Sequence, residues 1–166
     1  VRIDIATWKP EATIEVGLNP TRLEATANGY VVCVCNGFFD SEQYVYSIAP
    51  DNSPYMMGYG SDCVAVGTKA YATYTVTDWA TMKTTCTLSL FDPATAEIEK
   101  GNLTGTPLDF SPTFLSYDAT RQLLVMGRRA ADSDYTAAGS VEFRRTDGKL
   151  EKTFALGVEP CSIVAL

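Results

Sequence analysis

The chain of 166 residues contains no histidine. Histidine is the usual general base of enzymes, the commonest metal ligand and the partner of nucleophilic serine or cysteine. Its absence excludes a Ser-His or Cys-His catalytic pair, and a His-ligated metal centre, built from these residues alone. Chemistry that uses only carboxylates, tyrosine or lysine remains compatible with the composition.

Positive charge is also scarce, because 13 Lys and Arg stand against 20 Asp and Glu, for a net charge of −7. Such a surface repels phosphate backbones, so we expect no nucleic-acid partner. The sequence has no run of Lys or Arg of the kind that holds anionic lipid. It also has no stretch near the ~20 apolar residues that span a bilayer, so we expect no transmembrane segment.

Cysteine is sparse and odd in number, with residues at Cys33, Cys35, Cys63, Cys86 and Cys161. Five cysteines do not make a dense disulfide framework, and the Cys-x-Cys pair lacks the spacing of a redox CxxC motif. We take Cys33 and Cys35 to point to opposite faces of one strand. We interpret the cysteines as buried thiols that act as small hydrophobic residues, with metal binding or a disulfide as the alternative.

Four stretches of the chain share one pattern: an alternating apolar strand, a turn with Pro or Asp-Gly, a second strand and a closing Gly. They begin at Arg2, Tyr44, Thr87 and Ser140, so successive starts are 42, 43 and 53 residues apart. A period of about 40–50 residues with several short strands per unit is typical of β-propellers. We therefore predict an all-β fold, a β-propeller made of four-stranded blades.

Three complete blades and two partial blades can be placed on the sequence, as one domain over residues 1–166. The blades cover residues 2–16 (third and fourth strands only), 17–58, 59–101, 102–156 and 157–166 (first strand only). The predicted strands are 22–26, 30–35, 43–48 and 55–58 in the first complete blade, 62–66, 70–76, 85–91 and 97–100 in the second, and 113–117, 122–127, 141–145 and 150–156 in the third.

The two partial blades together lack one strand, and a half-ring exposes long unpaired edges, which folded proteins avoid. We therefore expect this chain to be the C-terminal half of a ring of about seven blades. The missing half, or another protein subunit, would then be a bound partner. A second copy of the chain that completes the ring is the alternative.

Two segments, residues 13–38 and 139–166, resemble the YVTN-type or YncE-like propeller repeat. Both contain a Gly-x-x-Pro pattern, at Gly17 to Pro20 and at Gly157 to Pro160, and the first ends its buried strand in Asn-Gly. The second blade departs from this pattern, since no Pro follows Gly58. The resemblance implies an exported protein of the cell surface or periplasm, often a lipoprotein, and some such proteins from gut anaerobes capture cobalamin. It implies no catalytic residues.

One end of the predicted propeller carries richer loops than the other. The turns between first and second strands, and between third and fourth strands, are short and polar. The loops at the opposite end carry aromatic, aspartate and arginine side chains, which suit recognition on a rigid scaffold. The predicted ligand-binding residues are Phe38, Phe39, Asp40, Tyr59, Asp78, Trp79, Arg128, Asp132 and Tyr135. The plainer interpretation is that Phe38 and Phe39 pack between blades and that Trp79 caps a blade edge.

Three functions fit these features. The first is a non-catalytic, exported propeller that binds a ligand or partner on its loop-rich face, with a corrinoid or another large amphipathic molecule as the specific form. The second is a protein-interaction scaffold or a subunit of a transporter. The third is a carboxylate-based lyase or glycosidase, for which Asp40, Asp78 and Asp132 are the residues to test. We predict no cofactor and no metal site.

Overall fold

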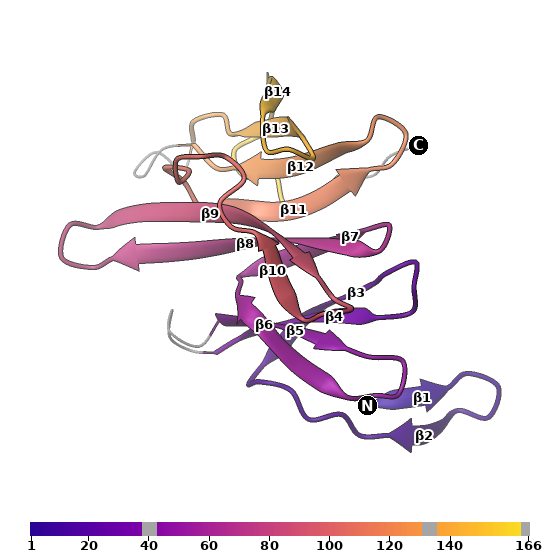
Figure 1. Cartoon of the computed structure of the whole chain (residues 1–166). Coiled ribbons are helices and arrows are strands. Elements are labelled where there is room, and N and C mark those ends of the chain that lie inside the picture. Colours follow the sequence, from indigo (N-terminus) through magenta and orange to yellow (C-terminus); the bar gives the residue numbers. More distant parts are fainter. Residues whose placement is uncertain (38–42, 131–135, 164–166) are drawn as a thin grey trace.

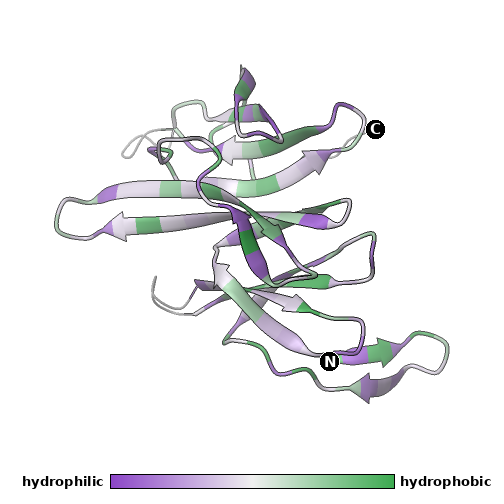
Figure 2. Ribbon diagram, in the orientation of Figure 1, coloured by the Kyte–Doolittle hydropathy of each residue, from purple (hydrophilic) through white to green (hydrophobic). Residues whose placement is uncertain are grey.

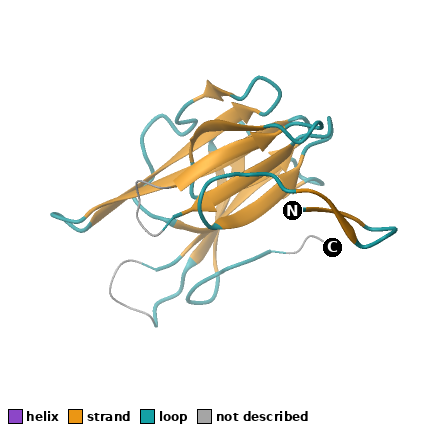
Figure 3. Ribbon diagram, turned by 90° about the horizontal axis from the view of Figure 1, so that it is seen from below, coloured by secondary structure: helices purple, strands orange, loops and turns teal. Residues whose placement is uncertain are grey.

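The computed structural model describes residues 1–37, 43–130 and 136–163 (Figure 1). These residues form strands, turns and loops and no helix (Figure 3). The strands are β1 (Arg2–Asp4), β2 (Lys9–Ala12), β3 (Pro20–Ala25), β4 (Val31–Asn36), β5 (Gln43–Ile48), β6 (Pro54–Tyr59), β7 (Asp62–Val66), β8 (Lys69–Asp78), β9 (Lys83–Asp92), β10 (Glu97–Lys100), β11 (Pro112–Asp118), β12 (Leu123–Arg128), β13 (Ser140–Arg145) and β14 (Leu150–Ala155).

Strands that follow one another along the chain also lie side by side. β3–β6, β7–β10 and β11–β14 each form a four-stranded antiparallel sheet in sequence order, and β1 and β2 form a two-stranded sheet. The first strand β7 contacts both β3 and β11, the first strands of the neighbouring sheets, whereas the fourth strands lie outermost. The described residues therefore form three complete blades, here blades 1 to 3, and a two-stranded part of another blade.

The second strand of each blade is apolar because both of its faces are covered. Val32 and Val34 of β4 point toward blade 2 and pack with Ala70 and Ala72 of β8. The opposite face of β4, with Cys33, belongs to a separate cluster. Hydrophobic residues are correspondingly concentrated in strands such as β12 (Figure 2).

The core between blades 2 and 3 is the largest hydrophobic cluster. Leu88 of blade 2 and Leu115, Leu124 and Met126 of blade 3 are fully buried in it. The connection between the blades, over residues 101–111, contributes Leu103, Leu108 and Phe110 to the same cluster. Each pair of neighbouring complete blades thus shares one continuous core.

One kind of hairpin turn occurs four times among the described residues, starting at Asp4, Asp78, Asp92 and Asp118. In each turn the aspartate carboxylate accepts a hydrogen bond from the backbone N–H two residues later, at 2.8–3.0 Å. Such a side chain replaces a backbone partner and fixes the turn. The fifth residue of each turn has a positive φ, namely Trp8 (55°), Met82 (55°), Ala96 (57°) and Gln122 (58°).

The predicted strands of the three complete blades are confirmed, with ends that differ by no more than two residues. The strand predicted for residues 161–166 is not observed over 161–163, and residues 164–166 lie outside the described part. The prediction that Cys33 and Cys35 point to opposite faces is wrong. Residues two apart in a strand share a face, and their Sγ atoms lie 3.8 Å apart.

Candidate functional site

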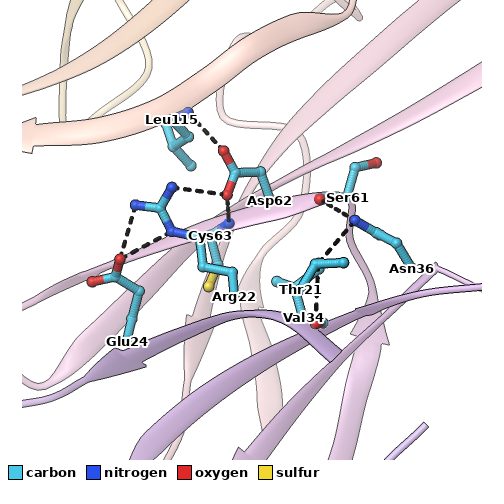
Figure 4. A network of polar contacts seen from close by, with 9 residues as sticks. All are labelled: Thr21, Arg22, Glu24, Val34, Asn36, Ser61, Asp62, Cys63 and Leu115. Carbon is cyan, nitrogen blue, oxygen red and sulfur yellow. Dashed lines mark hydrogen bonds and ion pairs between the residues drawn. The ribbon is translucent and has the colours of Figure 1, made fainter. Parts of the chain in front are cut away.

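The first residues of β3, β7 and β11 meet at the end of the blades where the longer loops lie. They enclose a recess of about 300 Å³ with mostly polar walls. The recess is lined by Thr21, Arg22, Asn36, Ser61, Asp62, Thr73, Thr75, Ser111, Pro112 and Thr113. It lies at the innermost position of the array, and Figure 4 shows the polar contacts beside it.

Asp62, the first residue of β7, connects the three innermost strands. Its Oδ2 accepts a hydrogen bond from the backbone N–H of Leu115 in β11 at 2.7 Å, and its Oδ1 lies 3.3 Å from Nη1 of Arg22 in β3. Oδ1 also accepts the N–H of Cys63 at 2.8 Å. Burial raises the pKa of this carboxyl, and Arg22 and the two backbone donors oppose that rise. Asp62 therefore holds blade 2 to both neighbours (Figure 4).

Arg22 is shared between two carboxylates. Its Nε and Nη2 lie 3.0 and 2.8 Å from Oε1 of Glu24. Its Nη1 lies 3.3 Å from Oδ1 of Asp62. Residues 22 and 24 lie on one face of β3, so the strand presents a polar pair toward blade 2. The guanidinium is about one-third exposed and forms part of the recess wall.

Asn36, the last residue of β4, has one polar atom without a partner. Its Nδ2 donates to Oγ1 of Thr21 at 3.1 Å and to the backbone carbonyl of Ser61 at 2.9 Å. A carbonyl can only accept, which fixes the orientation of the amide. Oδ1 is enclosed and, among the described residues, has no hydrogen-bond donor. A buried acceptor without a donor costs free energy of desolvation, and a hydrogen bond from a donor would remove that cost.

The hydroxyl groups around the recess are ordered by their own contacts. Ser61 Oγ donates to Oε1 of Gln43 at 2.5 Å and accepts the backbone N–H of Thr75 at 2.9 Å. Ser111 Oγ donates to Oγ1 of Thr75 at 3.4 Å. The wall thus combines a cation, a carboxylate, an amide and several hydroxyls.

The predicted residue Tyr59 lies in a stack of three tyrosines across blades 1 and 2. Its ring centroid is 5.5 Å from that of Tyr44 and 5.2 Å from that of Tyr74, with interplanar angles of 27° and 25°. Tyr59 itself is 54% exposed. The stack supplies a fixed aromatic surface at the end of β6.

The predicted residue Arg128 ends β12 and is held on three sides. Its guanidinium lies 4.6 Å from the ring centroid of Phe110, 3.5 Å from a carboxylate oxygen of Asp109 and 3.8 Å from one of Glu142. Glu142 in turn binds Arg144 through two contacts of 2.9 and 2.6 Å, and both side chains are buried. Arg128 is therefore oriented by the core between blades 2 and 3.

Asp78 and Trp79 lie at the tip of the β8–β9 hairpin, which extends away from the blades (Figure 1). The Asp78 carboxylate accepts the hydroxyl of Thr81 at 2.7 Å and the N–H of Ala80 at 2.9 Å, and these bonds lower its pKa. Trp79 is 70% exposed, so it does not cap a blade edge. Asp78 has a structural role in the turn, whereas Trp79 is presented to solvent.

Four of the predicted residues lie in the described part of the chain, and the structure does not gather these four into one pocket. None of Tyr59, Asp78, Trp79 and Arg128 lines the recess. The predicted residues Phe38, Phe39, Asp40, Asp132 and Tyr135 lie outside the described residues. Sequence reasoning missed Arg22 and Asn36, although a charged residue inside a first strand and a polar residue ending an apolar strand were available signals.

The cysteine side chains lie mostly in the core. All five cysteines are free, and only Cys161 is exposed. Burial raises the pKa of Cys33 to about 12 and that of Cys86 to about 11, so both are neutral thiols at pH 7. Within residues 1–37, 43–130 and 136–163, no three His, Cys, Asp or Glu side chains group as metal ligands.

The chain folds into successive four-stranded antiparallel sheets whose first strands contact those of the next sheet. This arrangement defines the class of the protein, the β-propeller. No family model and no curated protein matches the chain. Among solved structures, the chain is similar to one titled "Structure of Dos1 propeller", with a TM-score of 0.55 and 15% sequence identity. The match covers 83% of this chain and 37% of that chain, so this chain spans well under half of a solved propeller.

The structural likeness confirms the propeller fold and extends to nothing finer. The YVTN-type resemblance and its implications for export and cobalamin stay predictions. In the described residues, no helix is long and apolar enough to cross a membrane.

Proposed function

We propose that this protein is a non-catalytic propeller that binds a ligand at its loop-rich end, with the polar recess between the inner strands as the anchoring point. The recess is the observation that carries the proposal. Three blades contribute to it, and its donors and acceptors are fixed before any ligand arrives, which lowers the entropic cost of binding. Oδ1 of Asn36 has no hydrogen-bond donor among the described residues, and a ligand donor that reached it would remove its desolvation cost.

The recess is small for a complete ligand. Its volume of about 300 Å³ is at the lower end for small-molecule sites. A large ligand would therefore place one polar group in the recess and rest on the surrounding loops. Tyr59 is the last residue of β6, and its ring is exposed. It is the aromatic residue nearest in sequence to Ser61 and Asp62, which line the recess. Trp79 would contact only a ligand or partner that reaches the β8–β9 tip.

A corrinoid is the specific ligand that the resemblance to YncE-like propellers suggests. It is large and amphipathic, and its side groups end in amides that can donate hydrogen bonds. The same resemblance favours an exported protein at the cell surface or in the periplasm. The alternative of a carboxylate-based enzyme depends on Asp40, Asp78 and Asp132. Of these, the structure describes only Asp78, whose carboxylate is bound within its own turn.

A titration tests the proposal. Cobalamin is added to the protein, and binding is followed by absorbance and calorimetry. Ser111→Trp fills the mouth of the recess from an exposed position and should weaken binding by about tenfold or more, whereas Thr120→Trp, in a turn after β11, should not. Equal affinity in both variants contradicts the recess as the site. No spectral shift at saturating cobalamin contradicts the corrinoid, and a panel of other amphipathic ligands then tests the recess.

A further inference from the structure

β8 is much longer than β7, the strand on its inner side. β8 has ten residues, whereas β7 has five and pairs only with the first part of β8, from Lys69 to Thr73. The part of β8 from Thr75 to Asp78 extends past β7 and pairs with β9 on its outer side (Figure 1). Within the described residues, no strand pairs with its inner side. Blade 2 already has four strands and a complete blade on each side, so no further blade strand belongs there.

Every second residue of β8 directs its backbone groups to this inner side. The N–H of Ser61 donates to the carbonyl of Thr73 there at 2.5 Å, and the N–H of Thr75 donates to Ser61 Oγ at 2.9 Å. The same orientation returns two residues later in an extended strand, so the N–H and C=O of Thr77 also face the inner side. Among the described residues, neither group has a hydrogen-bond partner. Unpaired groups of this kind are a template for another strand.

The free inner edge of β8 runs from the polar recess to the tip of the hairpin. Thr75 lines the recess, and Trp79, which is 70% exposed, follows the last residue of β8. Thr75 and Thr77 lie on one face of the hairpin, and Val76, which is 38% exposed, lies on the other. A strand beside this edge would therefore meet hydroxyl groups on one face, an aliphatic side chain on the other and an indole ring at its end.

We propose that the inner edge of β8 binds an extended segment of a partner protein by strand addition. Backbone hydrogen bonds with Thr77 give affinity, and alternate side chains give specificity. The segment has hydroxyl or amide side chains on the face of Thr75 and aliphatic side chains on the face of Val76. It is neutral or basic, because this chain carries a charge of −7 and Arg22, the cation of the recess, is already paired with two carboxylates. Such a partner is distinct from the ligand of the recess, and its binding needs no ligand there.

An acetylated and amidated peptide, Thr-Val-Gln-Val-Thr-Val, has the required alternation and serves as the probe. It is titrated into the full chain, and the heat of binding and the hydrogen exchange of the backbone amides are measured. We expect one-to-one binding and slower exchange at the Thr77 amide, with the Thr84 amide unchanged. The same peptide methylated at its backbone nitrogens keeps its side chains but loses its backbone donors, so it should bind about tenfold more weakly or worse.

Two matched variants test the edge itself. Thr77→Pro removes the N–H that faces the inner side, and proline is tolerated at a strand position whose N–H is not used within the sheet. Thr84→Pro is the control, because Thr84 is the cross-strand partner of Thr77 and its N–H faces the opposite edge of the hairpin. Both changes remove the same contact between the two hydroxyl groups. Thr77→Pro should weaken peptide binding by about tenfold or more, whereas Thr84→Pro should leave it unchanged.

Several results would overturn strand addition at this edge. One is the absence of binding at about 1 mM peptide, and another is equal binding to Thr77→Pro and Thr84→Pro. Equal binding of the methylated peptide has the same meaning, because side chains alone would then account for the affinity, and this arm does not depend on the folding of a variant. If Ser111→Trp abolishes binding while Thr77→Pro does not, the peptide occupies the recess instead of the edge.

Discussion

Removing the carboxylate of Glu142 should be among the most damaging single changes in this protein. Glu142 and Arg144 face the core that blades 2 and 3 share, on the same side of the sheet as Leu124 and Met126. Arg144 is only 8% exposed, and apart from Glu142 its guanidinium donates to the carbonyl of Gly148 at 3.0 Å. Glu142→Leu leaves a buried cation without its counter-ion.

The expected cost of Glu142→Leu is about 3–5 kcal/mol of unfolding free energy, the usual effect of breaking a buried ion pair from one side. Replacing both partners with leucine removes the charge as well as its partner, and such replacements are often neutral or stabilising. The double variant should therefore exceed Glu142→Leu in stability by roughly 3 kcal/mol or more. The single change is more harmful than the double change.

Urea unfolding, followed by circular dichroism and fluorescence, measures these differences. With a denaturant slope of about 2 kcal/mol/M, Glu142→Leu lowers the midpoint by roughly 1.5–2.5 M. Coincident transitions by the two probes are needed before the values are compared. A loss below about 1 kcal/mol in Glu142→Leu, or a double variant less stable than the single one, would refute the reasoning from burial.

Three shorter predictions follow from other features. The hydrogen bond from Lys69 lowers the pKa of Asp92, so the stability that this carboxylate contributes is present above pH ~4 and lost as the pH falls through its folded pKa. Asp92→Asn should therefore flatten the acid side of a plot of stability against pH. An unaltered plot argues against the contact. Ellman's reagent should modify Cys161 rapidly in the native protein and the other four thiols only in denaturant. Gly148→Ala should destabilise by ~2 kcal/mol or more, because φ is 90° and the new Cβ would lie 2.5 Å from the carbonyl oxygen of Leu103; an unchanged melting temperature contradicts this.

The blades could be predicted because each is continuous in sequence. Alternating apolar residues, turn signals such as Asn28-Gly29 and the repeat period all act locally, so the twelve strands of the complete blades were found. The length of the β8–β9 hairpin was underestimated. Its outer part is polar, and the hydroxyl groups of Thr77 and Thr84, 3.2 Å apart, pair only once the strands have met.

The recess could not be predicted in the same way. Arg22, Asn36, Asp62 and Leu115 come from three blades, and their contacts depend on how the sheets pack rather than on any local spacing. Sequence reasoning placed the functional end of the molecule by topology and chose the loop residues there. It did not foresee that Asp78 would be used by its own turn or that Arg128 would be held by Phe110 and two carboxylates.

The order in which the cores are assembled has a consequence for biosynthesis. The core between blades 1 and 2 draws on residues from Val32 to Phe91, so it can close before any strand of blade 3 has been made. The core between blades 2 and 3 needs Met126, much later in the chain. A chain that emerges from the ribosome N-terminus first would therefore bury its apolar faces one blade at a time. At each stage, the most recent blade presents an apolar face that the next blade covers.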